Sequence, residues 1–267
     1  MSLRWTSWAA TDVGTVRSTN EDAFVDQPGA GVWAVADGAG GHDHGEVASA
    51  ALKAALEADL RNSGGDLVGE VRHRVAGVHE ALCRRAAQEG AAGGHSVTIA
   101  STLVVLLAQE EHFACLWCGD SRAYLLRDGA FTQLTRDHSL VQEMVDAGLI
   151  APGEAEHHPR ANVLSRAIGA AGAAPELDKV LGVAQPGDRF LLCSDGLFKV
   201  LDAAAIGHMA LAADPARTLV QAALAGAARD NVTAVVIAAH ACGNGGEDAT
   251  DDDSTRLILP RGKPFDL

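Results

Sequence analysis

Hydrophobic and polar positions change their spacing several times along the chain, which predicts a mixture of strands and helices. Short apolar runs rich in β-branched residues predict strands, whereas apolar residues three and four positions apart predict amphipathic helices. The expected strands cover residues 5–12, 23–25, 32–36, 102–108, 112–118, 123–126, 131–134, 189–193 and 232–239. The expected helices cover residues 45–60, 66–88 and 140–147, with two more after Gly196. Strands joined by short turns, with helices in separate blocks, indicate an α+β fold.

Local signals set the expected boundaries of these elements. Gly90 is expected to end the second helix, and Ser139 and Asp214 are expected to cap the starts of later helices. The polar segment 137–169 has too few apolar residues for a core of its own, so we expect a flap beside a sheet. Residues 1–241 are therefore expected to form one domain. Residues 242–267 are rich in glycine and acids, which predicts a disordered tail.

Composition narrows the possible functions. The 267 residues carry a net charge of −14, which argues against binding nucleic acid or an anionic membrane surface. No apolar run is long enough to span a bilayer, and no signal peptide is evident, so we expect a cytoplasmic protein without membrane insertion. The five cysteines are expected to be reduced thiols. Cys115 and Cys118 lie three residues apart in an expected strand, which would point them to opposite faces.

Four aspartates, Asp37, Asp120, Asp195 and Asp230, each lie at the boundary of an apolar strand. Taken alone, Asp37-Gly38 could be an ordinary hairpin turn. Several carboxylates gathered at one edge of a sheet would repel one another without a counter-charge, so the four together suggest a shared cation site. Carboxylate oxygens suit Mg²⁺ or Mn²⁺, and two such ions with a bridging water would suit hydrolysis of a phosphate ester. Arg17 could then hold the phosphate oxygens.

Six short stretches resemble, in order, the motifs of the bacterial metal-dependent serine/threonine protein phosphatases (PPM family, type 2C). The resemblance extends from about residue 5 to residue 240. The stretches are Gly14-x-Val16-Arg17-x-x-Asn20-Glu21-Asp22, Val35-Ala36-Asp37-Gly38-x-Gly40-Gly41-His42, Gly119-Asp120-Ser121-Arg122, Leu134-Thr135-x-Asp137-His138-Ser139, Ser194-Asp195-Gly196 and Asp230-Asn231-x-Thr233. The resemblance implies a four-layer α-β-β-α sandwich, in which two packed antiparallel sheets are flanked by helices. Periodicity alone would not select this arrangement over another α+β layout.

The resemblance also implies roles for the site residues. Asp37 would bridge two Mn²⁺ or Mg²⁺ ions, with the Gly38 carbonyl on one ion and Asp195 and Asp230 on the other. Asp120 would join Asp195 in holding a third, weaker metal.

The remaining implied roles concern residues near the N-terminus and one departure from the family. Glu21 and Asp22 would act mainly through metal-bound waters, and Arg17 would hold the phosphate. Position 39 is alanine, where bacterial relatives usually carry methionine and animal enzymes carry a histidine thought to act as general acid. His42 is an alternative proton donor, although in relatives it stabilises the turn. The pair His157-His158 could bind a metal, but a solvated loop is the simpler interpretation because no third ligand is evident.

The leading hypothesis is thus a metal-dependent phosphatase acting on phosphoserine and phosphothreonine in proteins. One alternative is a catalytically silent, metal-binding regulatory module that binds phosphoproteins, and another is a hydrolase of small phosphate esters. The resemblance implies phosphoprotein substrates and a cognate serine/threonine kinase, and we expect a monomer. The stretch from Gly31 to Asp37 also resembles relatives associated with type VI secretion.

Overall fold

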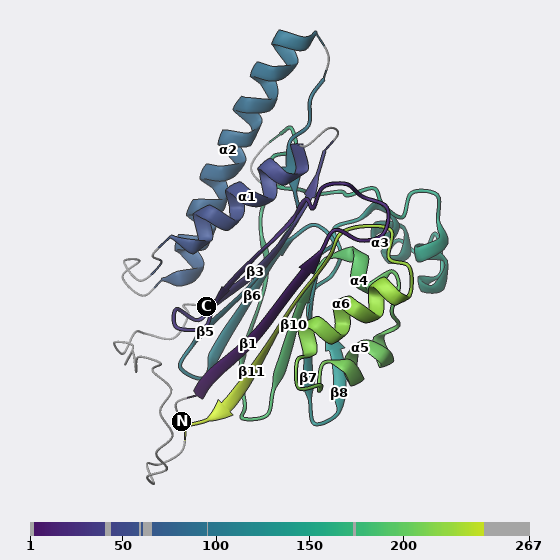
Figure 1. Cartoon of the computed structure of the whole chain (residues 1–267). Helices are drawn as coiled ribbons and strands as arrows, with labels where there is room; N and C mark the ends of the chain where they lie inside the picture. Colours follow the sequence, from purple (N-terminus) through teal and green to yellow (C-terminus); the bar gives the residue numbers. More distant parts are fainter. Residues whose placement is uncertain are drawn as a thin grey trace.

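Two antiparallel sheets form the centre of the molecule (Figure 1). The computed structural model describes residues 3–40, 44–58, 60, 66–94, 96–172 and 175–242. The first sheet has the strand order β1 (Leu3–Asp12), β11 (Val232–Ala241), β10 (Arg189–Cys193), β7 (Arg122–Arg127) and β8 (Ala130–Gln133). The second has the order β2 (Asp22–Gln27), β3 (Val32–Ala39), β5 (Leu103–Gln109), β6 (His112–Cys118) and β9 (Asp178–Val183), and β4 (Ala100–Ser101) pairs with β3.

Helices cover the outer face of each sheet, as Figure 1 shows. The second sheet packs against α1 (His44–Glu57) and α2 (Leu67–Gly93). The first sheet packs against α4 (Asp195–Phe198), α5 (Ala203–Met209) and α6 (Pro215–Ala225). Segment 137–169 contains α3 (Leu140–Asp146) and a 3₁₀ helix, η1 (Pro152–His157). The predicted arrangement of two packed antiparallel sheets flanked by helices is confirmed.

The strands between two buried faces carry continuous apolar runs, because alternate side chains enter different cores. Along β5, Leu103, Val105 and Leu107 pack toward α1 and α2, whereas Val104, Leu106 and Ala108 face the other sheet. Phe113 and Phe190 meet edge to face between the sheets, with ring centroids 4.9 Å apart. The same alternation separates two cysteines of β6: Cys115 enters the core between the sheets, and Cys118 enters the core under the helices. The predicted opposite facing of this pair is confirmed.

Several predicted boundaries were wrong. Gly90 does not end α2, which continues to Gly93 and is capped by Gly94 in the left-handed conformation. One glycine costs a helix only about 0.5–1 kcal/mol, which the packed helix tolerates. The strand predicted over residues 32–36 runs on to Ala39, because Gly38 pairs with Ser101 of β4.

Other elements were missed. The edge strand β9 carries Asp178, Lys179 and Gly182 among half-exposed apolar residues, so its pattern is too mixed to predict a strand. Three helices rather than two follow β10, because the four-residue α4 is too short to display helical periodicity. Gly41 and His42 of the second motif, and the tail from residue 243 onward, lie outside the described residues. No helix in the described part of the chain is long and apolar enough to cross a membrane.

Candidate metal centre

Five acidic residues lie near one another where strands of both sheets end or begin. Asp22 and Asp37 are directly opposite each other on the paired strands β2 and β3. Asp120 follows β6, Asp195 begins α4 directly after β10, and Asp230 precedes β11. Electrostatic repulsion from the other four acids acts on Asp37. The structure therefore brings together the four aspartates singled out from the sequence and adds Asp22 to them.

Backbone and side-chain hydrogen bonds fix the position of Asp37. The N–H of Thr102 donates to the Asp37 carbonyl at 2.8 Å, and the N–H of Asp37 donates to Thr102 Oγ1 at 3.1 Å. Ser101 Oγ also donates to the Asp37 carbonyl, at 2.9 Å. Burial raises the pKa of Asp37 well above its usual value, and repulsion from Asp22 and the other acids adds to that shift. A rigid backbone thus holds this carboxyl group among like charges.

The carboxyl group of Asp22 is buried and accepts hydrogen bonds from two hydroxyl groups. Its Oδ2 accepts hydrogen bonds from Ser194 Oγ and Thr233 Oγ1, both at 2.7 Å. Its Oδ1 is buried and has no hydrogen-bond partner among the described residues. Burial raises the pKa of Asp22 to about 7, although these two hydrogen bonds act in the opposite direction. A buried oxygen without a partner is a position that a water or cation would satisfy.

Asp120 is also buried. Burial raises its pKa to about 7, repulsion from Asp195 adds to this, and attraction from Lys199 lowers it. Asp120 is 7% exposed. Its environment therefore favours a positive charge close to it.

Two of the aspartates already contact side-chain cations. Arg17 Nε lies 2.9 Å from Asp230 Oδ1, and Arg17 Nη2 donates to Asp230 Oδ2 at 3.0 Å. Lys199 forms an ion pair with Asp195 across one turn of helix. Within the described residues, no group of three or more His, Cys, Asp or Glu side chains is already arranged to coordinate a metal ion. Metal ligation by Asp195 would therefore require this carboxylate to be shared with Lys199, and ligation by Asp230 would require Arg17 to share or release its carboxylate.

Asn231 positions the segment that carries Arg17. Its Nδ2 donates to the carbonyl oxygens of Val13 and Thr19 at 2.9 and 3.0 Å. Its Oδ1 accepts a hydrogen bond from the N–H of Glu21 at 2.8 Å. This one amide therefore ties the loop between β1 and β2 to the start of β11, next to Asp230.

Gly38 and Glu21 lie in a crowded position beside α1. The N–H of Gly38 donates to the Glu21 carbonyl at 3.1 Å. A Cβ atom at position 38 would lie 2.2 Å from the Gly45 carbonyl oxygen, so only glycine fits there. The Glu21 carboxyl group also lies close to Gly45. The implied metal-ligating role of the Gly38 carbonyl and the water-mediated role of Glu21 stay predictions.

The donor set fits a divalent cation. Three carboxyl groups, those of Asp22, Asp37 and Asp120, have pKa values raised first by burial and then by their acidic neighbours. Such repulsion is relieved when a hard cation lies among the oxygens. The unpartnered Oδ1 of Asp22 is consistent with the same conclusion.

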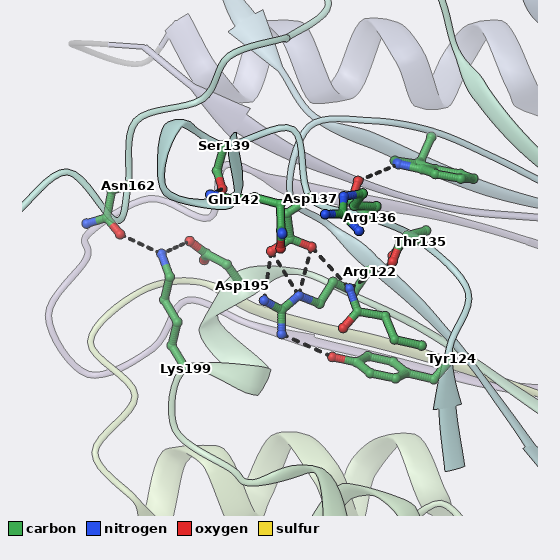
Figure 2. A network of polar contacts seen from close by, with 12 residues as sticks. Arg122, Tyr124, Thr135, Arg136, Asp137, Ser139, Gln142, Asn162, Asp195 and Lys199 are labelled. Atoms are coloured by element: carbon green, nitrogen blue, oxygen red, sulfur yellow. Dashed lines mark hydrogen bonds and ion pairs between the residues drawn. The ribbon is translucent and has the colours of Figure 1, made fainter. Parts of the chain in front are cut away.

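Segment 137–169 reaches Asp195 of this cluster through Lys199, which Figure 2 shows between Asn162 and Asp195. Arg122 forms a bidentate ion pair with Asp137, at 2.9 and 2.7 Å, and its guanidinium group lies 3.7 Å from the centroid of the Phe198 ring. A pocket of about 220 Å³ opens between the segment and the site. Asp120, Asp137, Asn162, Phe198 and Lys199 are among the residues that line it. The segment's position agrees with the predicted flap, whose function stays a prediction.

Several residues that organise the site were not predicted from the sequence. Ser194, Asn231 and Thr233 lie within the quoted motifs, and their neighbours Asp195 and Asp230 could have drawn attention to them. Lys199 had no such signal beyond its spacing of four residues from Asp195. Asn162 had none, because its contact with Lys199 joins positions 37 residues apart. Of the proposed histidine ligands, the side chain of His157 lies outside the described residues, and His158 Nδ1 accepts from the Arg160 N–H.

Sequence comparisons show what the chain resembles. A family model described as protein phosphatase 2C matches residues 15–226. The chain is 39% identical over 235 residues to the serine/threonine protein phosphatase PstP of Mycobacterium tuberculosis, covering 85% of this chain and 44% of PstP. It is 33% identical over 236 residues to protein phosphatase PhpP of Streptococcus pneumoniae, covering 85% of this chain and 94% of PhpP. The chain thus spans less than half the length of PstP.

Solved structures show the same similarity. The catalytic domain of PstP in complex with two manganese ions superposes with a TM-score of 0.78 at 35% identity, covering 90% of this chain and 100% of that domain. PppA, described as a key regulatory component of T6SS in Pseudomonas aeruginosa, superposes with a TM-score of 0.75 at 40% identity. That match covers 88% of this chain and 97% of PppA.

Proposed function

Because this chain belongs to the protein phosphatase 2C family, we propose that it is a metal-dependent phosphatase of phosphoserine and phosphothreonine in proteins. The observation that carries the proposal is the gathering of Asp22, Asp37 and Asp120, whose pKa values are raised by burial and by mutual repulsion. A set of buried acids without matching positive charge is unfavourable unless cations bind there.

The proposed site would hold two Mn²⁺ or Mg²⁺ ions. Asp37 and the Gly38 carbonyl, together with Asp195 and Asp230, are the proposed ligands. When bound, the ions would supply an activated water for attack on phosphorus and would offset the charge of the phosphate. Asp22 and Glu21 would orient waters of the ions, and the hydroxyl groups of Ser194 and Thr233 would keep the Asp22 carboxyl in place.

Arg17 is the proposed phosphate-binding residue. Its planar guanidinium group already donates two parallel bonds to the carboxylate of Asp230, a geometry that also matches two phosphate oxygens. If Asp230 ligated a cation, its carboxylate would attract Arg17 less strongly. Metal loading would thereby free the guanidinium group for the substrate.

We also propose the setting in which this enzyme works. Phosphoproteins and a cognate serine/threonine kinase are the proposed partners, the protein is proposed to be a cytoplasmic monomer, and nucleic acid is not a proposed ligand. The net charge of −14 supports the last point. The similarity to PppA supports a search for substrates among regulators of type VI secretion.

A silent regulatory module is less well supported. Such a protein would be expected to lose a metal-binding aspartate or Arg17, yet Arg17, Asp37, Asp195 and Asp230 are all in place. The hydrolysis of small phosphate esters has no specific support from the geometry of the site.

The test is hydrolysis of a phosphothreonine peptide with Mn²⁺, with EDTA, and by the variants Asp37→Asn and Asp195→Asn. We expect activity that requires the metal and is lost in both variants. Asp128→Asn is the matched control, because Asp128 also precedes a glycine but lies in the turn between β7 and β8. An inactive protein with metal bound would favour the silent module. Activity that survives EDTA and both substitutions would exclude the proposed metal centre.

A further inference from the structure

Lys199 bridges two parts of the protein that are distant in sequence. It lies directly after α4, where its N–H donates to the Asp195 carbonyl. Its Nζ forms an ion pair with the carboxylate of Asp195 and donates to Asn162 Oδ1 at 2.7 Å. Figure 2 shows the ammonium group between these two side chains. One cation thus joins the candidate metal centre to segment 137–169.

The charge of Lys199 acts on more than one acid. Attraction to Asp195, then to Asp120 and Asp37, stabilises the charged form of Lys199 against its burial. Lys199 also lines the pocket of about 220 Å³ together with Asp120 and Asn162. The side chain of Lys199 is 36% exposed and that of Asp195 is 14% exposed, so solvent screens this pair only in part. The Asp120–Asp195 end of the site therefore already has a positive charge supplied by the chain.

We propose that Lys199 is a positioning residue whose ammonium group takes the place of an additional metal ion between Asp120 and Asp195. The same group links these acids to Asn162 of the flap, segment 137–169. The proposal rests on the proposed function, since it assigns Asp195 to the metal centre. A fixed ammonium group at this position repels any further cation that approaches Asp120 and Asp195. The family resemblance implies a third, weaker ion at this pair, so the expectation for this chain is different: two ions bind, and Lys199 opposes the third.

The link to Asn162 adds a second consequence. Asn162 lies beyond η1 in segment 137–169, and its Oδ1 accepts a hydrogen bond from a charged donor, which is stronger than a neutral one. Lys199 would therefore restrain the flap while it neutralises the acids. Loss of the ammonium group should change both the metal stoichiometry and the protection of the flap.

The primary experiment measures Mn²⁺ binding to the full chain by calorimetry and by electron paramagnetic resonance of the free ion. Lys199→Met keeps the length of the side chain and removes its charge, and Lys199→Arg keeps the charge. Lys179→Met is the matched control, because Lys179 is an exposed lysine on the edge strand β9. We expect two ions on the unmodified protein and on Lys199→Arg. We expect a third ion on Lys199→Met, bound about 10-fold or more tightly than any third ion on the unmodified protein.

Hydrogen exchange of residues 158–166 provides a readout that does not depend on metal. We expect faster exchange in Lys199→Met and Asn162→Ala than in the unmodified protein, with Lys179→Met unchanged. Asn162→Ala should leave the number of bound ions at two, which separates restraint of the flap from neutralisation of the acids.

Two results would overturn the proposal. One is a third ion bound equally by the unmodified protein and Lys199→Met, and the other is unchanged exchange of the flap in both variants. Activity of the unmodified protein on a phosphothreonine peptide separates this failure from failure of the proposed function. An active enzyme with unaltered metal binding in Lys199→Met would reject the role of Lys199 alone, whereas an inactive, metal-loaded protein would reject the proposed function.

Discussion

Two ion pairs of the acidic cluster differ in their surroundings. Arg17 and Asp230 contact each other through two nearly equal bonds, yet their side chains are 50% and 43% exposed. Lys199 and Asp195 are 36% and 14% exposed, and Lys199 also contacts Asn162. Exposed pairs contribute about 0–1 kcal/mol to stability, whereas screening by water is weaker for a half-buried pair.

This difference suggests that the two side-chain cations act differently beside the proposed metal ligands. Arg17 is carried by a loop, and its exposed pair with Asp230 costs little to break, so we expect a phosphate to replace Asp230 as its partner. Lys199 is attached to α4 and contacts the flap, so its charge stays in place. We therefore expect Arg17 to act on the substrate and Lys199 to act on the metal and the flap.

The largest expected effect is that of Arg17→Ala on catalysis. We expect kcat/KM for a phosphothreonine peptide to fall by about 10²- to 10³-fold, the scale of losing one donor to a developing negative charge. Arg17→Lys should recover part of this loss, because a lysine keeps the charge but not the planar fork. Steady-state kinetics at saturating Mn²⁺ measures both. An unchanged kcat/KM in Arg17→Ala would contradict the expectation that Arg17, unlike Lys199, acts on the substrate.

The next effect concerns the amide that holds the Arg17 loop. Asn231→Ala removes three hydrogen bonds and leaves the Glu21 N–H without its acceptor. We expect the free energy of unfolding to fall by about 1–3 kcal/mol, measured by urea denaturation. Gln221→Ala is the control, because Gln221 is an exposed amide on α6, and its effect should stay within about 0.5 kcal/mol. Equal effects of the two substitutions would contradict the conclusion that the Asn231 side chain holds the loop between β1 and β2 in place.

The pH dependence of stability tests the acidic cluster without metal. Burial raises the pKa of Asp22 to about 7 in the folded protein, so the folded state holds this proton more tightly than the unfolded state. The free energy of unfolding of the EDTA-treated protein should therefore fall as the pH rises from about 4 to about 7. Asp22→Asn should make this dependence shallower, which urea denaturation at several pH values would show. A stability that rises with pH equally in both proteins would contradict the burial of a protonated Asp22.

The smallest expected effect is the coupling energy within each ion pair. A double-mutant cycle of Arg17→Ala and Asp230→Ala in the metal-free protein should give less than about 1 kcal/mol. The cycle of Lys199→Ala and Asp195→Ala should give a larger value, because Asp195 is 14% exposed. A larger coupling energy for Arg17–Asp230 than for Lys199–Asp195 would mean that solvent exposure does not determine the strength of these two ion pairs.

The sequence by itself determined most of the fold and the identity of the acids. Apolar runs over residues 102–108 and 112–118 predicted two strands, and these pair as β5 and β6. Ser139 and Asp214 predicted helix starts, and both side chains accept bonds from backbone N–H groups as expected. Motif order indicated that Asp37, Asp120, Asp195 and Asp230 belong to one site.

The tertiary structure decided how these acids are neutralised. Arg17 reaches Asp230 across 213 positions, and Lys199 reaches Asn162 across 37. Local propensity and periodicity act over a few residues, so they carry no signal for contacts at this separation. Asp22 was named for its motif, yet its buried position between Ser194 and Thr233 depends on β2, β10 and β11 meeting at one edge. The physical reason is that burial and long-range charge contacts exist only after the two sheets have packed.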